Sequence, residues 1–278
     1  MSVFLRFWVG LLASVCLMVS GCKDSDVAVG GHEIAVTNSY LGCAVKDLRG
    51  QDGAILCLAP PGMCPGHFDI SPVQVRQLKG CKLLLRFEFQ QGIEQRLERM
   101  RQGGLDIQAV QTSGGLCMPD TYVAVCRQAC GILSRTYPQE AARFQARLAA
   151  IEERMVKLAA ELQGTVMESG IAGSVALASN HQAEFARWLT LDPVATFVGS
   201  DTESVANIDH CLKKTAGLDV RFVIANQQEG VALAQALADR CKAKAVVFSN
   251  FPQTCEPEVG FDRLLRDNVR GLCEAAIR

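Results

Sequence analysis

Hydrophobic and polar positions between residues 138 and 162 follow a helical period. From Phe144 onward, large apolar side chains recur at alternating steps of four and three, which places them in one stripe along an α-helix. The stripe consists of Phe144, Leu148, Ile151, Met155, Leu158 and Leu162. Proline at position 138 suits a first helical turn, and Gly164 suits a stop. The pattern predicts one long helix, which we interpret as a spine.

On both sides of this helix, short apolar runs alternate with amphipathic segments. Strands are predicted at 34–37, 54–59, 83–87 and 105–110 before the helix, and at 173–178, 194–198, 220–225 and 245–249 after it. Strands that alternate with helices favour parallel sheets covered on both faces. We therefore predict an α/β fold of two lobes, each a parallel sheet of about four strands flanked by helices, joined by one long spine helix. This alternation favours a spine over a short coiled coil, which the same apolar stripe would also suit.

One of the helices between these strands carries a clear start signal. Ser71 followed by Pro72 predicts a helix start, because serine caps the exposed N–H groups and proline fits the first turn. Further helices are predicted over 92–101 and 228–241.

The N-terminus has the pattern of a secretory signal. Arg6 precedes an apolar run from Phe7 to Met18, which is too short for a membrane span. The following residues, Val19-Ser20-Gly21-Cys22, resemble a bacterial lipobox, in which Cys22 becomes the lipid-modified first residue of the mature protein. The alternative is a plain signal with an incidental cysteine.

These observations give a domain plan. Residues 1–21 form the signal peptide, 22–31 a lipidated tether, 32–136 the N-terminal lobe, 137–163 the spine helix and 164–278 the C-terminal lobe. A lipid on Cys22 would anchor the protein to a membrane without spanning it.

The composition narrows the class of protein. With 278 residues, of which 49% are hydrophobic and 21% charged, the chain can form a substantial core and is not disordered throughout. A net charge of -1 lacks the basic excess of nucleic-acid-binding proteins, so we expect no nucleic-acid partner. Of the 13 cysteines, Cys16 leaves with the signal and Cys22 is the anchor. The odd number that remains leaves at least one thiol without a disulfide partner.

Candidate binding residues follow the predicted strands, where open α/β sheets hold their ligands. Four such segments are 60–72 with Cys64, His67 and Asp69, 112–120 with Cys117, 178–181 with His181, and 248–252 with Asn250. Singly, a histidine at such a junction is more often a capping or packing residue, and a loop cysteine in an exported protein is more often in a disulfide. Together, imidazole and thiolate suit zinc or copper better than manganese.

Signatures of catalysis are missing from the sequence. It contains no Gly-x-Ser-x-Gly elbow, no phosphate-binding glycine-rich loop before Lys-Ser/Thr and no His-Glu-x-x-His. We therefore expect a protein that is not an enzyme.

Several stretches match motifs of one known family. Residues 37–41 (TNSYL) resemble its first strand-to-helix turn, 66–72 (GHFDISP) its first metal-histidine loop, and 180–185 (NHQAEF) its later histidine motif. The chain thus resembles the metal-binding substrate-binding lipoproteins of zinc/manganese ABC transporters. The resemblance implies two α/β lobes joined by a long helix, which clamp one metal ion and deliver it to a membrane permease. It also implies that His67 and His181 are metal ligands from different lobes.

Two positions depart from the family pattern. The second family histidine is missing, and the register against Pro119 places Gly114 there. Cys117 or Cys64 could supply a thiolate instead. The fourth position, a carboxylate in the family, is Asn250, which we assign as a weak oxygen ligand or a hydrogen-bonding support. The absence of a carboxylate at the family position disfavours manganese as the bound metal and leaves the site short of negative charge.

These arguments lead to one principal hypothesis. The protein is a monomeric, lipid-anchored solute-binding protein, periplasmic or on the cell surface, that captures zinc for an ABC importer, with copper or manganese as less favoured cargo. One alternative is a thiol or redox lipoprotein in which Cys64 and Cys117 form a disulfide. Another is a scaffold or adhesin of the same fold that binds no metal.

Overall fold

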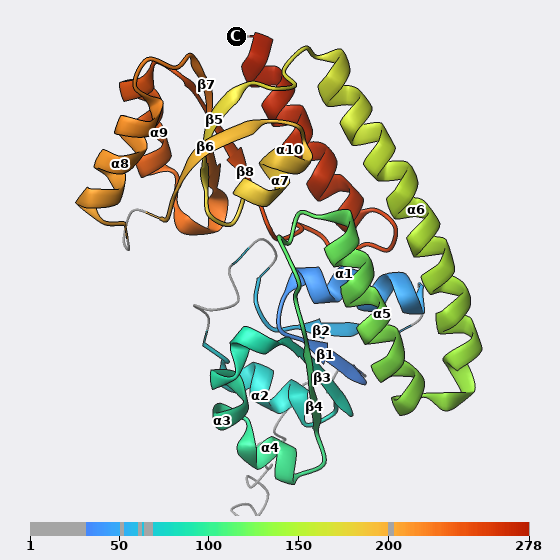
Figure 1. The fold of residues 1–278 in the computed structure, drawn as a ribbon. Helices are drawn as coiled ribbons and strands as arrows, with labels where there is room; N and C mark the ends of the chain where they lie inside the picture. The colour runs from blue at the N-terminus through green and yellow to red at the C-terminus, as the bar shows by residue number, and fades with distance from the viewer. Residues whose placement is uncertain (1–31, 51–52, 61–62, 64–68, 200–202, 278) are drawn as a thin grey trace, which may run out of the picture. The chain divides into compact units, whose positions relative to one another are not determined.

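The chain folds into two α/β lobes connected by a long helix (Figure 1). The computed structural model describes residues 32–50, 53–60, 63, 69–199 and 203–277. Within these residues lie two parallel four-stranded sheets, with strand orders β2-β1-β3-β4 and β6-β5-β7-β8. The predicted fold class is therefore confirmed. The predicted signal peptide and tether, including Cys22, lie outside the described residues.

The strands and helices alternate as the sequence predicts. The N-terminal lobe contains β1 (Ile34–Val36), α1 (Ser39–Arg49), β2 (Ile55–Cys57), α2 (Pro72–Leu78), β3 (Leu83–Phe87), η1 (Glu88–Gln90), α3 (Gly92–Arg96), α4 (Glu98–Gln102), β4 (Asp106–Val110) and α5 (Pro119–Thr136). The spine comprises η2 (Pro138–Glu140) and α6 (Ala141–Glu168). The C-terminal lobe contains β5 (Val175–Ser179), α7 (Ala183–Trp188), β6 (Asp192–Phe197), α8 (Val205–Thr215), β7 (Val220–Asn226), η3 (Gln227–Glu229), α9 (Ala232–Cys241), β8 (Lys244–Phe248) and α10 (Gly260–Ile277).

Apolar side chains cover both faces of each sheet. One hydrophobic core runs through both lobes and includes α6, while a smaller core lies on the other face of each sheet. Every residue of β3 is buried, which explains why four of its five side chains are apolar instead of alternating with polar ones; the exception, Arg86, is paired with Glu94. The predicted cap of α2 is also confirmed, because the Ser71 hydroxyl accepts a hydrogen bond from the backbone N–H of Gln74.

Two predicted helices are interrupted. The helix expected over 92–101 is divided into α3 and α4, with Leu97 at φ -103° and ψ 10° between them. The helix expected over 228–241 begins instead as the short turn η3, and Gly230 at φ +84° separates it from α9. A positive φ ends a right-handed helical turn. As a result, Glu229 belongs to the short turn directly after β7 rather than to α9.

The spine helix ends later than predicted. The expected stop at Gly164 is wrong, because α6 continues to Glu168. A single glycine in a helix costs only about 1 kcal/mol relative to alanine, and Val166 in the following turn is fully buried in the core. The predicted apolar stripe is confirmed, since all its members are buried except Leu148, which is half-buried.

An ionic network joins the spine to both lobes. The Arg154 guanidinium on α6 pairs with the Asp47 carboxylate on α1 and lies 3.3 Å from the Asp262 carboxylate on α10. Asp47 also accepts hydrogen bonds from the Tyr122 hydroxyl at 2.7 Å and the Glu258 backbone N–H at 2.6 Å. Both carboxylates are buried, and burial raises the pKa of Asp262 to about 6, against the opposing effect of Arg154. The network ties α1, α6 and α10 together.

Aromatic rings pack beside this network. The Tyr122 ring on α5 stacks on the Phe261 ring of α10, with 3.9 Å between their centroids. Tyr40 on α1 meets both rings edge-on, at 5.5 and 5.4 Å. Such pairs contribute about 0.5–1.5 kcal/mol each beyond the burial of their area. The two lobes therefore share one packed interface in addition to the spine.

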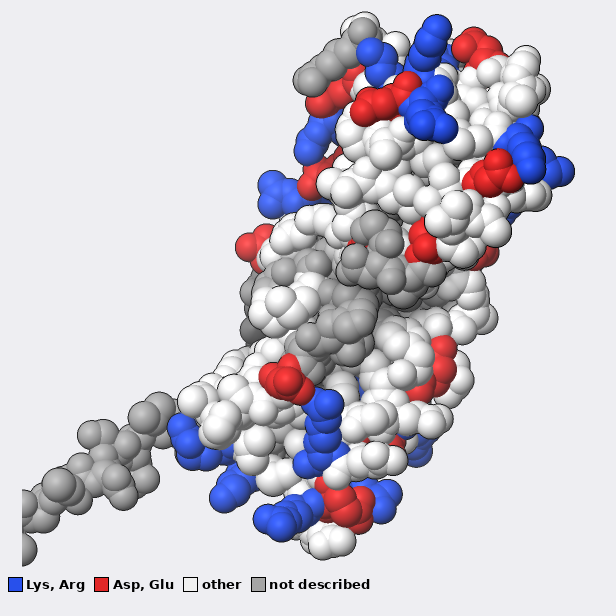
Figure 2. All heavy atoms as spheres, turned by 90° about the vertical axis from the view of Figure 1, so that its left-hand side faces the viewer, with Lys and Arg blue, Asp and Glu red and all other residues white. Residues whose placement is uncertain are grey.

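The surface in Figure 2 carries charges of both signs in alternation. This mixed pattern agrees with the net charge of -1 and differs from the single-sign basic stripe that typically marks a nucleic-acid-binding face. Among the helices of the described residues, none combines the length and apolar character needed to cross a membrane.

Replacing Arg154 tests the ionic network. We expect Arg154→Met to lower the free energy of unfolding by about 3 kcal/mol, at the lower end of the range for breaking a buried ion pair, because two buried carboxylates lose their counter-charge while the arginine side chain is itself 21% exposed. Urea unfolding followed by circular dichroism measures the change. The matched control is Lys157→Met on the same helix, which removes one partner of an exposed ion pair and should change stability far less. Equal losses in the two variants would contradict the network's role.

Candidate functional site

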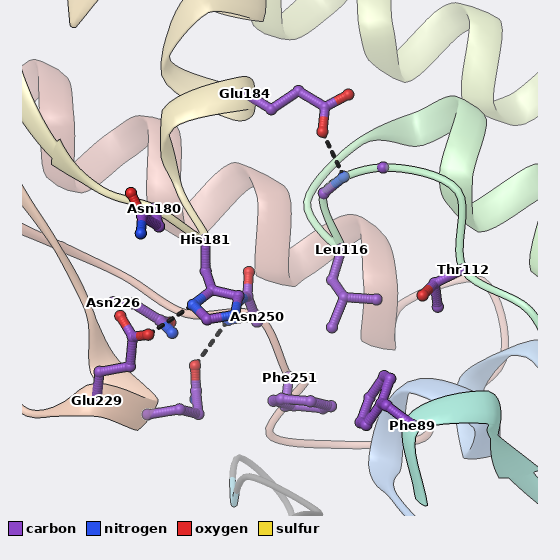
Figure 3. Close-up of a pocket in the computed structure, with 13 residues that line it drawn as sticks. Phe89, Thr112, Leu116, Asn180, His181, Glu184, Asn226, Glu229, Asn250 and Phe251 are labelled. Carbon is purple, nitrogen blue, oxygen red and sulfur yellow. Dashed lines mark hydrogen bonds and ion pairs between the residues drawn. The ribbon is translucent and has the colours of Figure 1, made fainter. Parts of the chain in front are cut away.

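A cavity of about 630 Å³ lies where strand ends of the two lobes face each other (Figure 3). It is lined by residues that follow β3, β4, β5, β7 and β8, in keeping with the ligand position of open α/β sheets. The lining consists of Phe89, Thr112, Gly114, Gly115, Leu116, Asn180, His181, Glu184, Asn226, Gln228, Glu229, Asn250 and Phe251. Most of these side chains are polar or charged, and Phe89, Leu116 and Phe251 supply the apolar part of the wall.

His181 is held in the cavity by a carboxylate. It lies in the turn after β5, and its Nδ1 is 2.5 Å from Glu229 Oε1 in the loop after β7 (Figure 3). The other Glu229 oxygen accepts a hydrogen bond from the Ser179 hydroxyl at 2.6 Å. When Nδ1–H donates to a carboxylate, the imidazole keeps Nε2 as its free lone pair. A carboxylate–histidine pair of this kind is how proteins orient a metal-binding imidazole.

The pair also changes the protonation of both groups. The hydrogen bond to Glu229 raises the pKa of His181 above its usual 6.5, against the opposing effect of burial. Burial raises the pKa of Glu229, but hydrogen bonds from His181 and Ser179 outweigh it and leave the pKa below its usual value. Protons and metal ions compete for the same imidazole. Metal capture by His181 is therefore expected to weaken as the pH falls through the raised pKa.

Asn250 and Cys117 belong to a buried hydrogen-bond network at the wall of the cavity. The Asn250 Oδ1 accepts from Gln182 Nε2 at 2.9 Å and from the Cys117 thiol at 3.3 Å. Cys117 is fully buried, and its thiol also donates to the Ser249 carbonyl at 3.1 Å. Burial raises the pKa of Cys117 to about 12, even though hydrogen bonds from Gln182 and Asn268 act against it. Cys117 is a neutral thiol behind the lining residues.

The loop after β4 is held by a carboxylate from the other lobe. Glu184 on α7 accepts a hydrogen bond from the Gly115 backbone N–H at 2.6 Å (Figure 3). Gly114 has φ +115°, and an added Cβ there would lie 3.1 Å from Glu184 Oε1 and from Thr121 Oγ1. A side chain at Gly114 would therefore be strained and crowded. Gly114 occupies the position where the family resemblance predicts a second histidine. Its backbone conformation and its close neighbours favour glycine there.

The sequence-predicted residues have different places in the structure. His181 and Asn250 line the cavity, and Cys117 lies behind its wall. His67, Cys64 and Cys22 lie outside the described residues. Three of the four predicted strand-end segments meet at the cavity, and Asp69 of the remaining segment is exposed and paired with Arg96.

Two functional candidates were not predicted. Glu229 and Glu184 are the carboxylates that line the cavity. Glu229 was assigned to a helix, although the glycine that follows it signals a break and would have placed it in a strand-end loop. Glu184 lies within the predicted histidine motif, but no sequence signal pairs it with the loop after β4. Among the described residues, no group of three or more His, Cys, Asp or Glu side chains is placed to hold a metal ion.

Replacing Glu229 tests the carboxylate–histidine pair. We expect Glu229→Gln to lower the pKa of His181, because the imidazolium loses its charged partner, and NMR titration of the His181 ring measures it. In the wild type this raised pKa stabilises the fold fully below pH 6.5, the unfolded value, and the contribution is lost as the pH rises through the folded value. The matched control is Glu184→Gln, a cavity carboxylate that binds Gly115 instead. An unchanged His181 titration in Glu229→Gln would refute the pairing.

The fold and the sequence both match known metal-binding proteins. The family model of ZnuA, described as zinc-uptake complex component A, periplasmic, matches residues 34–275. A comparison with curated proteins finds no match. Similar solved structures include a crystal structure of ZnuA, with TM-score 0.68, 14% identity and coverage of 88% of this chain and 99% of that one.

Two other solved structures are comparably similar. A metal-free mutant of a periplasmic metal binding protein from candidatus liberibacter asiaticus has TM-score 0.71 and 11% identity, covering 87% of this chain and 98% of that one. The laminin-binding protein Lbp of Streptococcus pyogenes has TM-score 0.67 and 12% identity, covering 88% and 99%. At such identities the structures establish the fold alone. Because the family model spans nearly the whole described chain, the protein belongs to the ZnuA family of periplasmic metal-binding, solute-binding proteins.

Proposed function

We propose that this protein captures a divalent transition-metal ion in the cavity between its lobes, with zinc as the cargo, and delivers it to the permease of an ABC importer. The observation that carries the proposal is the His181 imidazole, which lines the cavity with Nδ1 bound to Glu229, while Nε2 has no hydrogen-bond partner among the described residues. Membership of a family described by zinc uptake supports this cargo and the transport role. The protein acts in this proposal as a binding protein rather than an enzyme.

The proposed donor set extends beyond the described residues. His181 supplies one neutral imidazole, and we propose His67 as the second, with Cys64 as a thiolate candidate. Cys117 would have to lose a proton from a thiol whose pKa is about 12, so we place it after Cys64. Asn250 serves as a hydrogen-bonding support, since its amide oxygen already accepts two hydrogen bonds.

Carboxylates near the cavity bear on the choice of metal. Glu229 and Glu184 supply negative charge that the sequence alone did not place there. Zinc accepts nitrogen, sulfur and oxygen ligands, whereas manganese favours oxygen. Solved structures similar to this chain include a zinc-bound deletion mutant of ZnuA and manganese-bound and cadmium-bound forms of the liberibacter protein. The two proposed imidazole ligands, His181 and His67, favour zinc over manganese in this site.

The proposed location follows the family and the N-terminal motif. The family is described as periplasmic, and we propose that a lipid on Cys22 anchors the mature protein, as a monomer, to a bacterial membrane. Mass spectrometry of the protein from a bacterial host tests the lipid: the mature chain should begin at Cys22 with an added acyl mass, and Cys22→Ser should abolish it. A mature chain that begins elsewhere would refute the anchor.

A competitive zinc titration tests metal capture. We expect one zinc ion per chain in the reduced wild-type protein, and a loss of at least about tenfold in affinity in His181→Ala and in His67→Ala, because each removes a direct ligand. The matched control is His210→Ala, the same change on α8, away from the residues that line the cavity. Zinc should also raise the thermal stability of the wild type and of the control.

The same titration separates the alternatives. Tighter binding of copper that depends on the cysteines would keep metal capture and change the cargo. Absence of binding for zinc, copper and manganese would refute transport and favour the scaffold or adhesin hypothesis. Glu229→Gln should weaken zinc binding about tenfold or more while retaining the site, as expected for a group that orients a ligand.

A further inference from the structure

Three cysteines from distant parts of the chain meet outside the cavity. Cys43 lies on α1, Cys57 at the end of β2, and Cys255 in the loop between β8 and α10. The Cys43 thiol donates to the carbonyl of Thr254 at 3.3 Å, directly beside Cys255 in the chain. The Cys255 sulfur lies 3.5 Å from the Ser39 carbonyl, one helical turn before Cys43. The C-terminal loop is therefore in contact with the start of α1.

Two glycines allow this close approach. A Cβ added at Gly42 would lie 2.7 Å from the Cys255 sulfur, and one added at Gly260 would lie 2.5 Å from the Cys43 sulfur. Neither distance is compatible with ordinary packing. The backbone of α1 at Gly42 and that of α10 at Gly260 can therefore approach these sulfurs closely only because neither residue has a side chain.

The three thiols are also unequal in reactivity. The nearby Cys43 and Cys57 thiols, with help from the positive charge of Lys46, hold the pKa of Cys255 well below its usual value against the effect of burial. Proximity to the Cys255 sulfur, together with burial, raises the pKa of Cys43 and that of Cys57. The thiolate is the nucleophile in disulfide exchange. Cys43 is buried whereas Cys255 is half-buried, so Cys255 is also the more accessible of these two sulfurs to an oxidant.

We propose that Cys255 forms a disulfide with Cys43 that ties the β8–α10 loop of the C-terminal lobe to α1 of the N-terminal lobe, and that Cys57 can replace Cys43 by exchange. The structure describes the reduced form, in which all three cysteines are thiols. The proposal does not depend on metal binding. It would restrain the loop that follows Asn250 and Phe251 in the cavity lining.

The reaction uses a disulfide as oxidant, either a protein disulfide or oxidised glutathione. The Cys255 thiolate attacks one sulfur of the oxidant, forms a mixed disulfide and releases the other sulfur as a thiolate. Cys43 then loses its proton and attacks the Cys255 sulfur, releasing the second half of the oxidant. Two protein thiols are oxidised to one disulfide, and one external disulfide is reduced to two thiols. Attack of Cys57 on the Cys255 sulfur would release Cys43 without any net oxidation.

Disulfide mapping of the full chain tests this proposal. The protein is reduced, treated with oxidised glutathione, alkylated, digested with trypsin and analysed by mass spectrometry. The peptide 245–263, which contains Cys255, should be joined to peptide 24–46, with a smaller share joined to peptide 50–76. Peptide 50–76 contains both Cys57 and Cys64, so fragment ions that cleave between them identify the linked sulfur.

Single variants separate a specific link from general oxidation. Cys43→Ser should move the link to Cys57, Cys57→Ser should leave only the Cys43 link, and the double variant should lose at least nine-tenths of both. The matched control is Cys273→Ser on α10, a half-buried cysteine of the same lobe, which should leave the map unchanged. Far-UV circular dichroism identifies any variant that fails to fold, and the wild-type map decides the question by itself.

Recovery of Cys255 as an alkylated free thiol after oxidation of the wild type would overturn the proposal. So would a link from Cys255 to cysteines other than Cys43 and Cys57. In either case the three thiols would be small packing residues, and zinc binding would be unaffected.

Discussion

The guanidinium of Arg154 between two buried carboxylates is the constraint on which the arrangement of the lobes depends. A carboxylate removed from water is strongly unfavourable unless an opposite charge and hydrogen bonds replace the lost hydration. Asp47 and Asp262 come from helices that lie more than 200 residues apart in the chain, and one arginine on the spine supplies the opposite charge for both. The helices α1, α6 and α10 therefore have to meet at one place, and the stacked rings of Tyr122 and Phe261 fill the space beside them.

The cavity is a consequence of this arrangement. Each sheet is parallel, so its strand ends and the loops that follow them lie along one edge. With the lobes joined through the spine and the interface between α5 and α10, these two edges face each other across the cavity. The hydrogen bond from Gly115 to Glu184 connects the loops directly. The positions of the binding residues thus depend on charge pairing around Arg154 and on aromatic packing between α5 and α10, both of which lie outside the cavity.

The negative charge of the site lies at a different strand end from the one that the family pattern predicts. The strand end at β8 carries Asn250, whose amide is occupied within the wall, while the carboxylate next to His181 comes from the loop after β7. A carboxylate in that place can orient an imidazole without binding a metal itself. The cavity therefore contains more negative charge than the predicted ligand positions alone supply, because Glu229 and Glu184 are not among those positions.

The sequence by itself determined the class of fold. The apolar stripe of the spine, the alternation of strands with helices and the cap at Ser71 are local patterns whose period or chemistry can be read along the chain. The histidine at position 181 could be assigned to a strand end for the same reason. The predictions at Gly164 and at Gly230 are wrong: Gly164 lies inside a helix, whereas Gly230 interrupts one. Only the backbone conformation and the tertiary packing distinguish the two glycines.

The tertiary structure alone decided which residues face each other. The pairing of His181 with Glu229, the burial of Cys117 as a neutral thiol, and the meeting of Cys43, Cys57 and Cys255 all join segments that are distant in sequence. Neither spacing nor composition encodes such contacts, because they depend on strand order and on how the two lobes pack. Desolvation and charge pairing act over a few ångströms in space, whatever the separation along the chain, and they therefore become visible only once the fold is known.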